Sequence, residues 1–61
     1  MKVSELIKIL KKHGCKLKRN GGRHNIWYSP ITGNEFAVPR HEAKELKTGT
    51  ANSILKDAGI K

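Results

Sequence analysis

The spacing of apolar residues changes near residue 14 of this chain of 61 residues, and the change limits the folds that it can adopt. In the first ten residues apolar side chains recur every three or four positions, as they do on one face of an α-helix. From residue 15 to residue 19 apolar and basic residues alternate, as they do in a half-buried strand. The start of the chain therefore predicts a helix followed by a strand. The helical stripe comprises Val3, Leu6, Ile7 and Leu10.

Residues at both ends of this stripe are typical of helix boundaries. Ser4 belongs to the residue types that cap helix N-termini, and Glu5 follows it in the first turn. Gly14 supplies the left-handed residue that commonly ends a helix. We interpret His13, just before it, as a partner of the helix dipole.

The alternating segment predicts the first half of a hairpin. Its strand, residues 15–19, is expected to place Cys15 and Leu17 on one face and its lysines on the other. A turn at residues 20–22 leads to a second strand at residues 24–28, which is rich in the aromatic and β-branched residues that strands favour.

A second turn and a second helix complete the chain. The turn at residues 29–34 contains Pro and Gly, and it leads to a third strand at residues 35–38 that Pro39 closes. Thr48 is predicted to cap a last helix that ends at Gly59. The apolar stripe of this helix comprises Ala51, Ile54, Leu55 and Ala58.

The order of helix, three strands and helix predicts an α+β fold. Each helix has an apolar stripe and the sheet has one apolar face, so both helices are expected on one face of a three-stranded antiparallel sheet. A chain of 61 residues buries only about 60% of its unfolded surface, so residues 1–61 are expected to form a single domain.

The charge of the chain indicates a polyanionic partner. Thirteen lysines and arginines face five acidic residues, which gives a formal charge of +8. Such a field attracts nucleic acid first, and then an acidic protein or an anionic membrane surface. A domain this small also has little room for a deep cavity, which favours a polymer as the ligand.

Composition also bears on the cellular compartment of the protein and on its disulfide and metal chemistry. No apolar run approaches the roughly 20 residues that span a membrane, and no signal segment is recognisable, so we expect a cytoplasmic protein. The single cysteine, Cys15, excludes an internal disulfide. The spacing of the three histidines and Cys15 matches no zinc pattern, so neither a metal site nor another cofactor is expected.

His24 is the candidate general base. It follows the Gly21-Gly22 turn and opens the second predicted strand, where the sheet would hold it beside a backbone that a phosphate can approach. An imidazole is partly neutral near pH 7 and can accept a proton. RNA carries its own nucleophile, the 2′-hydroxyl beside each phosphate. A single histidine that acts as general base can therefore supply much of the catalysis. The alternative is a surface histidine behind a hairpin turn.

Cations and an open backbone near His24 are candidate phosphate ligands. For the basic residues among them, ordinary solvation of a surface charge is the competing interpretation. The candidates are Lys16, Lys18, Arg19, Gly22, Arg23 and Arg40.

Two further residue types have alternative roles. His41 follows the third strand, where it could bond the backbone and fix the linker, or act as a second acid or an RNA contact. Trp27 and Tyr28 are adjacent, so one is expected to pack against the helices and the other to face outward. An outward aromatic, for which Tyr28 is the candidate, could stack on a base.

The ordered set of these segments resembles the HicA family of toxin–antitoxin systems, which are small messenger-RNA interferases with a fold like double-stranded-RNA-binding domains. The resemblance runs nearly end to end. Its segments are the first helix with Leu6, Ile7 and Leu10 up to Gly14, Gly22-Arg23-His24, Ile26-Trp27-Tyr28, Pro39-Arg40-His41, Lys47-Thr48-Gly49-Thr50 and Ile54 to Gly59.

The resemblance implies a metal-independent endoribonuclease with His24 as its catalytic histidine. It also implies a HicB-type antitoxin that covers the basic face, so that the chain is a monomer when free and part of a hetero-oligomer with the antitoxin. The family commonly has Ser or Thr before the catalytic histidine, where this chain has Arg23. Arg23 then either replaces that residue as a phosphate ligand or alters substrate preference.

Three hypotheses follow. The first is a toxin that cleaves messenger RNA with His24 as general base, forms a 2′,3′-cyclic phosphate and arrests growth. The second is a non-catalytic RNA-binding module of the same fold. The third is a basic interaction protein that docks an acidic partner.

Overall fold

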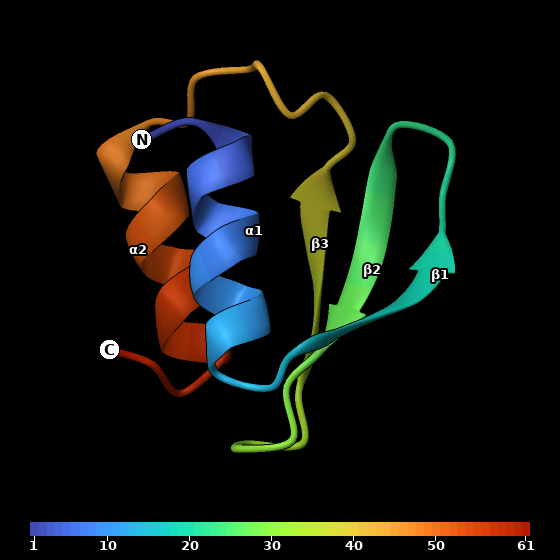
Figure 1. Ribbon diagram of the computed structural model, residues 1–61, viewed down its shortest axis with the longest axis vertical. Helices are drawn as coiled ribbons and strands as arrows, with labels where there is room; N and C mark the ends of the chain where they lie inside the picture. The colour runs from blue at the N-terminus through green and yellow to red at the C-terminus, as the bar shows by residue number, and fades with distance from the viewer.

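Two helices and a three-stranded antiparallel sheet make up the computed structural model, which describes residues 1–61 (Figure 1). The strands lie side by side in the order β1-β2-β3, so β2 is central. In chain order the elements are α1 (Val3–Lys12), β1 (Lys16–Asn20), β2 (His24–Tyr28), β3 (Glu35–Pro39) and α2 (Thr48–Asp57).

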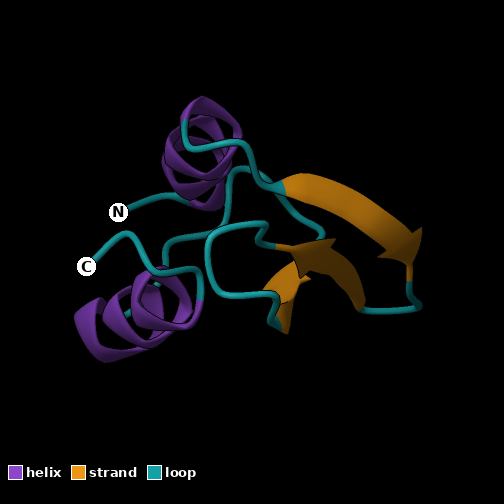
Figure 2. Cartoon of the chain, turned by 90° about the horizontal axis from the view of Figure 1, so that it is seen from below, coloured by secondary structure: helices purple, strands orange, loops and turns teal.

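Both helices lie on the same side of the sheet (Figures 1 and 2), which confirms the predicted α+β architecture. The sheet contributes Trp27, Phe36 and Val38 to a buried apolar core, and the helices contribute residues such as Leu6 and Leu10. Because neighbours along a strand point to opposite faces, the residues between these buried ones line the open face.

Trp27 and Tyr28 divide between the two faces as expected. Only 4% of Trp27 is exposed, whereas 37% of Tyr28 is exposed on the open face.

The predicted cap at Ser4 is wrong, because α1 begins at Val3 and its N-cap is Lys2, two residues before the predicted one. The Lys2 N–H donates to Oε1 of Glu5 (3.3 Å). The N–H of Ser4 donates to the Glu42 carbonyl of the segment after β3 (3.0 Å). A partner distant in sequence therefore satisfies a helix N-terminal donor that a capping side chain would otherwise serve.

The predicted cap at Thr48 is also wrong, because Thr48 is the first residue of α2 and Lys47 precedes it as N-cap. The entry to this helix is set by Leu46, which is buried and whose N–H donates to the Met1 carbonyl (2.8 Å). The N-terminal ammonium pairs with Glu45 at 2.8 Å. Their hydrogen bond raises the pKa of the ammonium and lowers the pKa of Glu45.

The C-terminal ends of both helices follow the prediction. Gly14 has φ of 85° and Gly59 has φ of 77°, the left-handed conformation that glycine adopts without strain. The next N–H after each glycine reaches back to a carbonyl of the last turn, from Cys15 to Leu10 (2.9 Å) and from Ile60 to Leu55 (3.0 Å).

Strand β1 differs from the expected alternation. Leu17 pairs with Trp27 and so faces the helix side, yet 46% of it is exposed. A bulge at Lys18 then leaves two residues, Lys18 and Arg19, opposite Ile26. The inserted residue interrupts the alternation of side chains between the two faces, because Lys18 and Arg19 together oppose a single residue of β2.

The turn between β2 and β3 caps the C-terminus of α2. The hydroxyl of buried Ser29 donates to the Ala58 carbonyl (2.6 Å). The Thr32 hydroxyl and the Asn34 amide both donate to the Asp57 carbonyl, at 2.8 and 3.1 Å. These bonds satisfy carbonyls that have no partner within the helix and tie α2 to the sheet.

Replacing Ser29 with Ala is expected to lower the free energy of unfolding by about 1–3 kcal/mol, because the buried Ala58 carbonyl loses its donor. Urea unfolding followed by circular dichroism measures the change. Ser53→Ala is the matched control, since Ser53 is exposed on α2 and its side chain makes no hydrogen bond within the chain. Equal effects of the two substitutions would contradict the capping role.

Candidate active site

The register between β2 and β3 brings two distant segments together at one end of the sheet. His24, the first residue of β2, pairs with Pro39, the last residue of β3. The N–H of Arg40 then donates to the Arg23 carbonyl (3.3 Å). The turn before β2 and the segment after β3 therefore lie side by side.

These two segments enclose a basic cleft of about 600 Å³. Five of its six lining residues carry basic side chains, and no acidic residue lines it. A cleft of this charge attracts phosphate groups. The lining residues are Arg23, His24, Pro39, Arg40, His41 and Lys44.

His24 is exposed within this cleft, as the candidate role requires. Side chains along β2 alternate between the two faces of the sheet. The His24 side chain therefore lies on the same face as Ile26 and Tyr28, opposite to the face of Trp27. The side chain makes no hydrogen bond or ion pair within the chain, so both ring nitrogens are free to contact a substrate. Its backbone is fixed by pairing to β3.

The two glycines before His24 have different roles. A Cβ at residue 21 would overlap the carbonyl oxygen of His24, so the close passage of the chain there requires Gly21. A Cβ at residue 22 would meet no atom within 4 Å. The backbone of Gly22 is thus open on one side, which agrees with the predicted approach of a phosphate.

Arg40 holds this turn in place. Its Nη1 donates to the carbonyls of Gly22 (2.9 Å) and Gly21 (3.4 Å). The sequence offered Arg40 only as a phosphate ligand, and the structure adds a positioning role. A guanidinium has five N–H donors, so donors remain for an anion in the cleft.

The Arg23 side chain, in contrast, does not bind the turn. It is exposed at the cleft and makes no hydrogen bond or ion pair within the chain. The Arg23 guanidinium is therefore available to an anion at the cleft.

His41 and Lys44 complete the cleft, and sequence reasoning did not place Lys44 in it. The His41 side chain makes no hydrogen bond within the chain, so it does not fix the linker as one interpretation held. The positions of both residues follow from the predicted order of the strands. Antiparallel pairing of the second and third strands brings the chain after Pro39 beside His24.

The cations of β1 do not join His24. Lys16, Lys18 and Arg19 lie on an edge strand and line no part of the cleft. Lys18 forms an ion pair with Glu35 across the open face. Tyr28 lies at the other end of β2 from His24, four residues or about 13 Å along the strand.

Two negative observations concern other kinds of site. No group of three or more His, Cys, Asp or Glu side chains is arranged to hold a metal ion. Neither helix is long and apolar enough to cross a membrane.

The fold and the cleft define a class of small basic α-β-β-β-α proteins with a histidine behind a glycine turn. A family model described as the HicA toxin of bacterial toxin–antitoxin matches residues 3–60. The chain belongs to this family of toxin–antitoxin mRNA interferases.

Similar proteins cover nearly the whole chain. The chain is 34% identical over 61 residues to the probable mRNA interferase HicA of Pseudomonas fluorescens strain Pf0-1, covering all of this chain and 98% of that protein. A solved structure, the crystal structure of the E. coli HicAB toxin–antitoxin complex, matches with a TM-score of 0.82 and 30% identity, over 98% of this chain and 100% of that one. These matches confirm the resemblance drawn from the sequence.

Gly21→Ala is expected to lower the free energy of unfolding by about 1–3 kcal/mol, because the added methyl forces the backbone at His24 to move. Gly22→Ala is the control one residue away, and the open space at residue 22 predicts a change within about 0.5 kcal/mol. Thermal and urea unfolding measure both. The assignment fails if the two substitutions are equally tolerated.

Proposed function

We propose that this chain is a metal-independent endoribonuclease toxin that cleaves messenger RNA, with His24 as its general base. The observation that carries the proposal is the exposed and unbonded His24 side chain in a cleft with five basic residues. The similar Pseudomonas fluorescens protein, a probable mRNA interferase, supports the same activity.

The proposed reaction uses the nucleophile that RNA already contains. His24 takes the proton of a 2′-hydroxyl, and the 2′-oxygen attacks the adjacent phosphorus. The bond from phosphorus to the 5′-oxygen breaks, and that oxygen takes up a proton. The products are a 2′,3′-cyclic phosphate and a 5′-hydroxyl end, so no water or metal-bound hydroxide is needed for the cleavage step.

The other residues of the cleft supply the remaining requirements. His41 lines the same cleft as His24 and gives the proton to the leaving 5′-oxygen. Arg23, Arg40 and Lys44 bind the phosphate and offset the charge that develops on its oxygens. The open backbone of Gly22 lets the phosphate come close to the turn.

The outer cations extend the binding surface. Lys16, Lys18 and Arg19 contact phosphates farther along the RNA, and Tyr28 offers an exposed ring on the same face to a base. These contacts set affinity and position and take no part in bond breaking. We place the activity in the cytoplasm and assign it to residues 1–61 acting as one domain.

A protein antitoxin belongs to the same proposal. The similar E. coli structure is a toxin–antitoxin complex, and a formal charge of +8 favours an acidic partner. A HicB-type antitoxin that covers the basic cleft would keep RNA out. The free chain is then a monomer, and the inactive form is a hetero-oligomer.

His24→Ala is expected to lower the rate of RNA cleavage by about 10²–10⁴-fold, the usual contribution of a general base. The assay is digestion of a defined RNA by purified protein, with and without a chelator, together with growth after expression. His13→Ala is the matched control, because His13 is exposed at the end of α1 and its Nδ1–H donates to the Ile9 carbonyl (2.9 Å). Unchanged cleavage by the His24 variant would reject the base, and loss of wild-type cleavage in chelator would reject metal independence.

His41→Ala is expected to lower the rate of RNA cleavage by about 10²–10⁴-fold, because the leaving 5′-oxygen then lacks its proton donor. A substrate with 4-nitrophenol as leaving group needs no proton, so it should restore the rate of the His41 variant and not that of His24→Ala. Equal loss on both substrates would show that His41 binds phosphate and is not the acid.

A further inference from the structure

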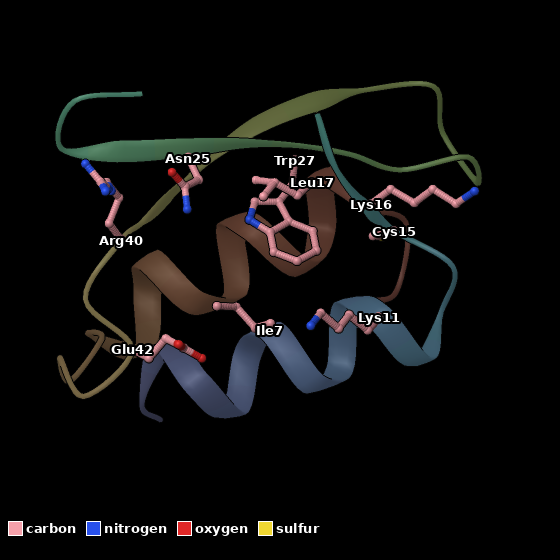
Figure 3. A pocket seen from close by; sticks show the side chains of 9 residues that line it. All are labelled: Ile7, Lys11, Cys15, Lys16, Leu17, Asn25, Trp27, Arg40 and Glu42. Atoms are coloured by element: carbon pink, nitrogen blue, oxygen red, sulfur yellow. The ribbon is translucent and has the colours of Figure 1, made fainter. Parts of the chain in front are cut away.

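A groove of about 450 Å³ lies between α1 and the β1–β2 hairpin, on the opposite side of the sheet from the His24 side chain (Figure 3). Ile7 and Lys11 of α1 form one wall, and Leu17 of β1 lies on the other side. Its volume falls within the range of small-ligand sites. Of its lining residues, only Arg40 takes part in the proposed cleavage step.

Two polar atoms in the groove have no partner. The indole N–H of Trp27 and the amide Oδ1 of Asn25 are both buried, and neither makes a hydrogen bond. Trp27 is only 4% exposed, and its indole nitrogen lies on the side of the ring toward Asn25 and Arg40 (Figure 3). Buried polar groups without partners are rare and call for an explanation. A ligand that offers one acceptor and one donor would satisfy both.

The rest of the groove suits a flat, weakly polar group. Leu17 is 46% exposed and Ile7 is partly buried, so apolar side chains are available to cover the face of a ring. A nucleobase combines an apolar face with adjacent donors and acceptors on its edge. A group as small as a base can therefore cover the apolar side chains of the groove without a large partner surface.

Charge and continuity connect the groove to the basic cleft. Three basic residues line the groove, Lys11, Lys16 and Arg40, against one acidic residue, Glu42. Arg40 also lines the cleft that contains His24. A polyanion whose phosphate occupies the cleft can therefore pass Arg40 and enter the groove with the next residue of its chain.

We propose that this groove binds one unpaired nucleobase of the RNA, next to the phosphate held in the cleft. The Trp27 N–H donates to an acceptor of that base, and Asn25 Oδ1 accepts from a donor beside it. The proposal rests on the proposed function for the identity of the polymer. It assigns base preference to Asn25 and Trp27, which lie outside the cleavage machinery.

The test uses binding, so that it does not depend on cleavage. Four RNA pentamers that differ only at the central base, and a fifth that lacks that base, are titrated into His24→Ala protein. Trp27 is the only tryptophan, so its fluorescence reports on the groove. One pentamer is expected to bind about tenfold tighter than the others and than the abasic one, the discrimination that a two-hydrogen-bond contact to a base provides.

Variants separate the groove from general charge attraction. Asn25→Leu and Trp27→Phe are expected to weaken the preferred pentamer about fivefold, the effect of one lost hydrogen bond, and to leave the abasic pentamer unchanged. Anisotropy of a dye-labelled pentamer measures both variants, and circular dichroism checks that they fold. Lys56→Ala is the control, because Lys56 is an exposed cation of α2 outside the groove. Its loss should weaken all five pentamers equally or not at all.

The outcomes distinguish this proposal from the cleavage proposal. Equal binding of all five pentamers overturns the base site, even if the wild-type protein cleaves RNA. A base preference that disappears in Asn25→Leu supports the site, even if the wild-type protein cleaves nothing. If an acidic partner protein shifts Trp27 fluorescence and no pentamer does, the groove is a protein-docking site and the proposal is wrong.

Discussion

The pairing of β2 with β3 is the constraint on which the rest of the structure depends. Its register, with His24 opposite Pro39 and Trp27 opposite Phe36, assigns one face of the central strand to the core and the other to solvent. The same pairing sets the position of the turn at one end, whose Ser29 hydroxyl binds the end of α2. At the other end it brings the basic segments together. A shift of one residue would exchange the buried and the exposed face of the strand.

The basic cleft is electrostatically unfavourable in the free chain. None of the five acidic residues lines it, and both ion pairs of the protein lie elsewhere. Like charges that are held together repel, and a phosphate or an acidic protein would relieve that repulsion. The register and the hydrogen bonds of the turn impose this arrangement on side chains that would otherwise separate. An anion-binding role is the simplest reason for a chain to maintain it.

Periodicity and turn residues were sufficient to predict the fold, because both helices and the strands β2 and β3 bury their own apolar residues. The caps at Ser4 and Thr48 were wrong because backbone contacts between distant segments, which no local pattern reveals, set those helix starts. The place of Lys44 in the cleft follows from the strand register and could have been predicted. The unpartnered groups in the groove could not, because they depend on how the Trp27 ring and the Asn25 amide are oriented within the folded protein.

The two arginines of the cleft have separate tasks, and this bears on the departure from the family pattern. Arg40 binds the carbonyls of the turn, so the shape of the turn does not depend on the side chain of residue 23. Arg23 contributes only its carbonyl to that arrangement, as the acceptor for the Arg40 N–H. A small hydroxyl residue could occupy the same backbone position without changing the turn. We therefore propose that the Arg23 side chain adds a phosphate contact to an existing scaffold, so that its replacement should change RNA affinity and salt dependence more than stability.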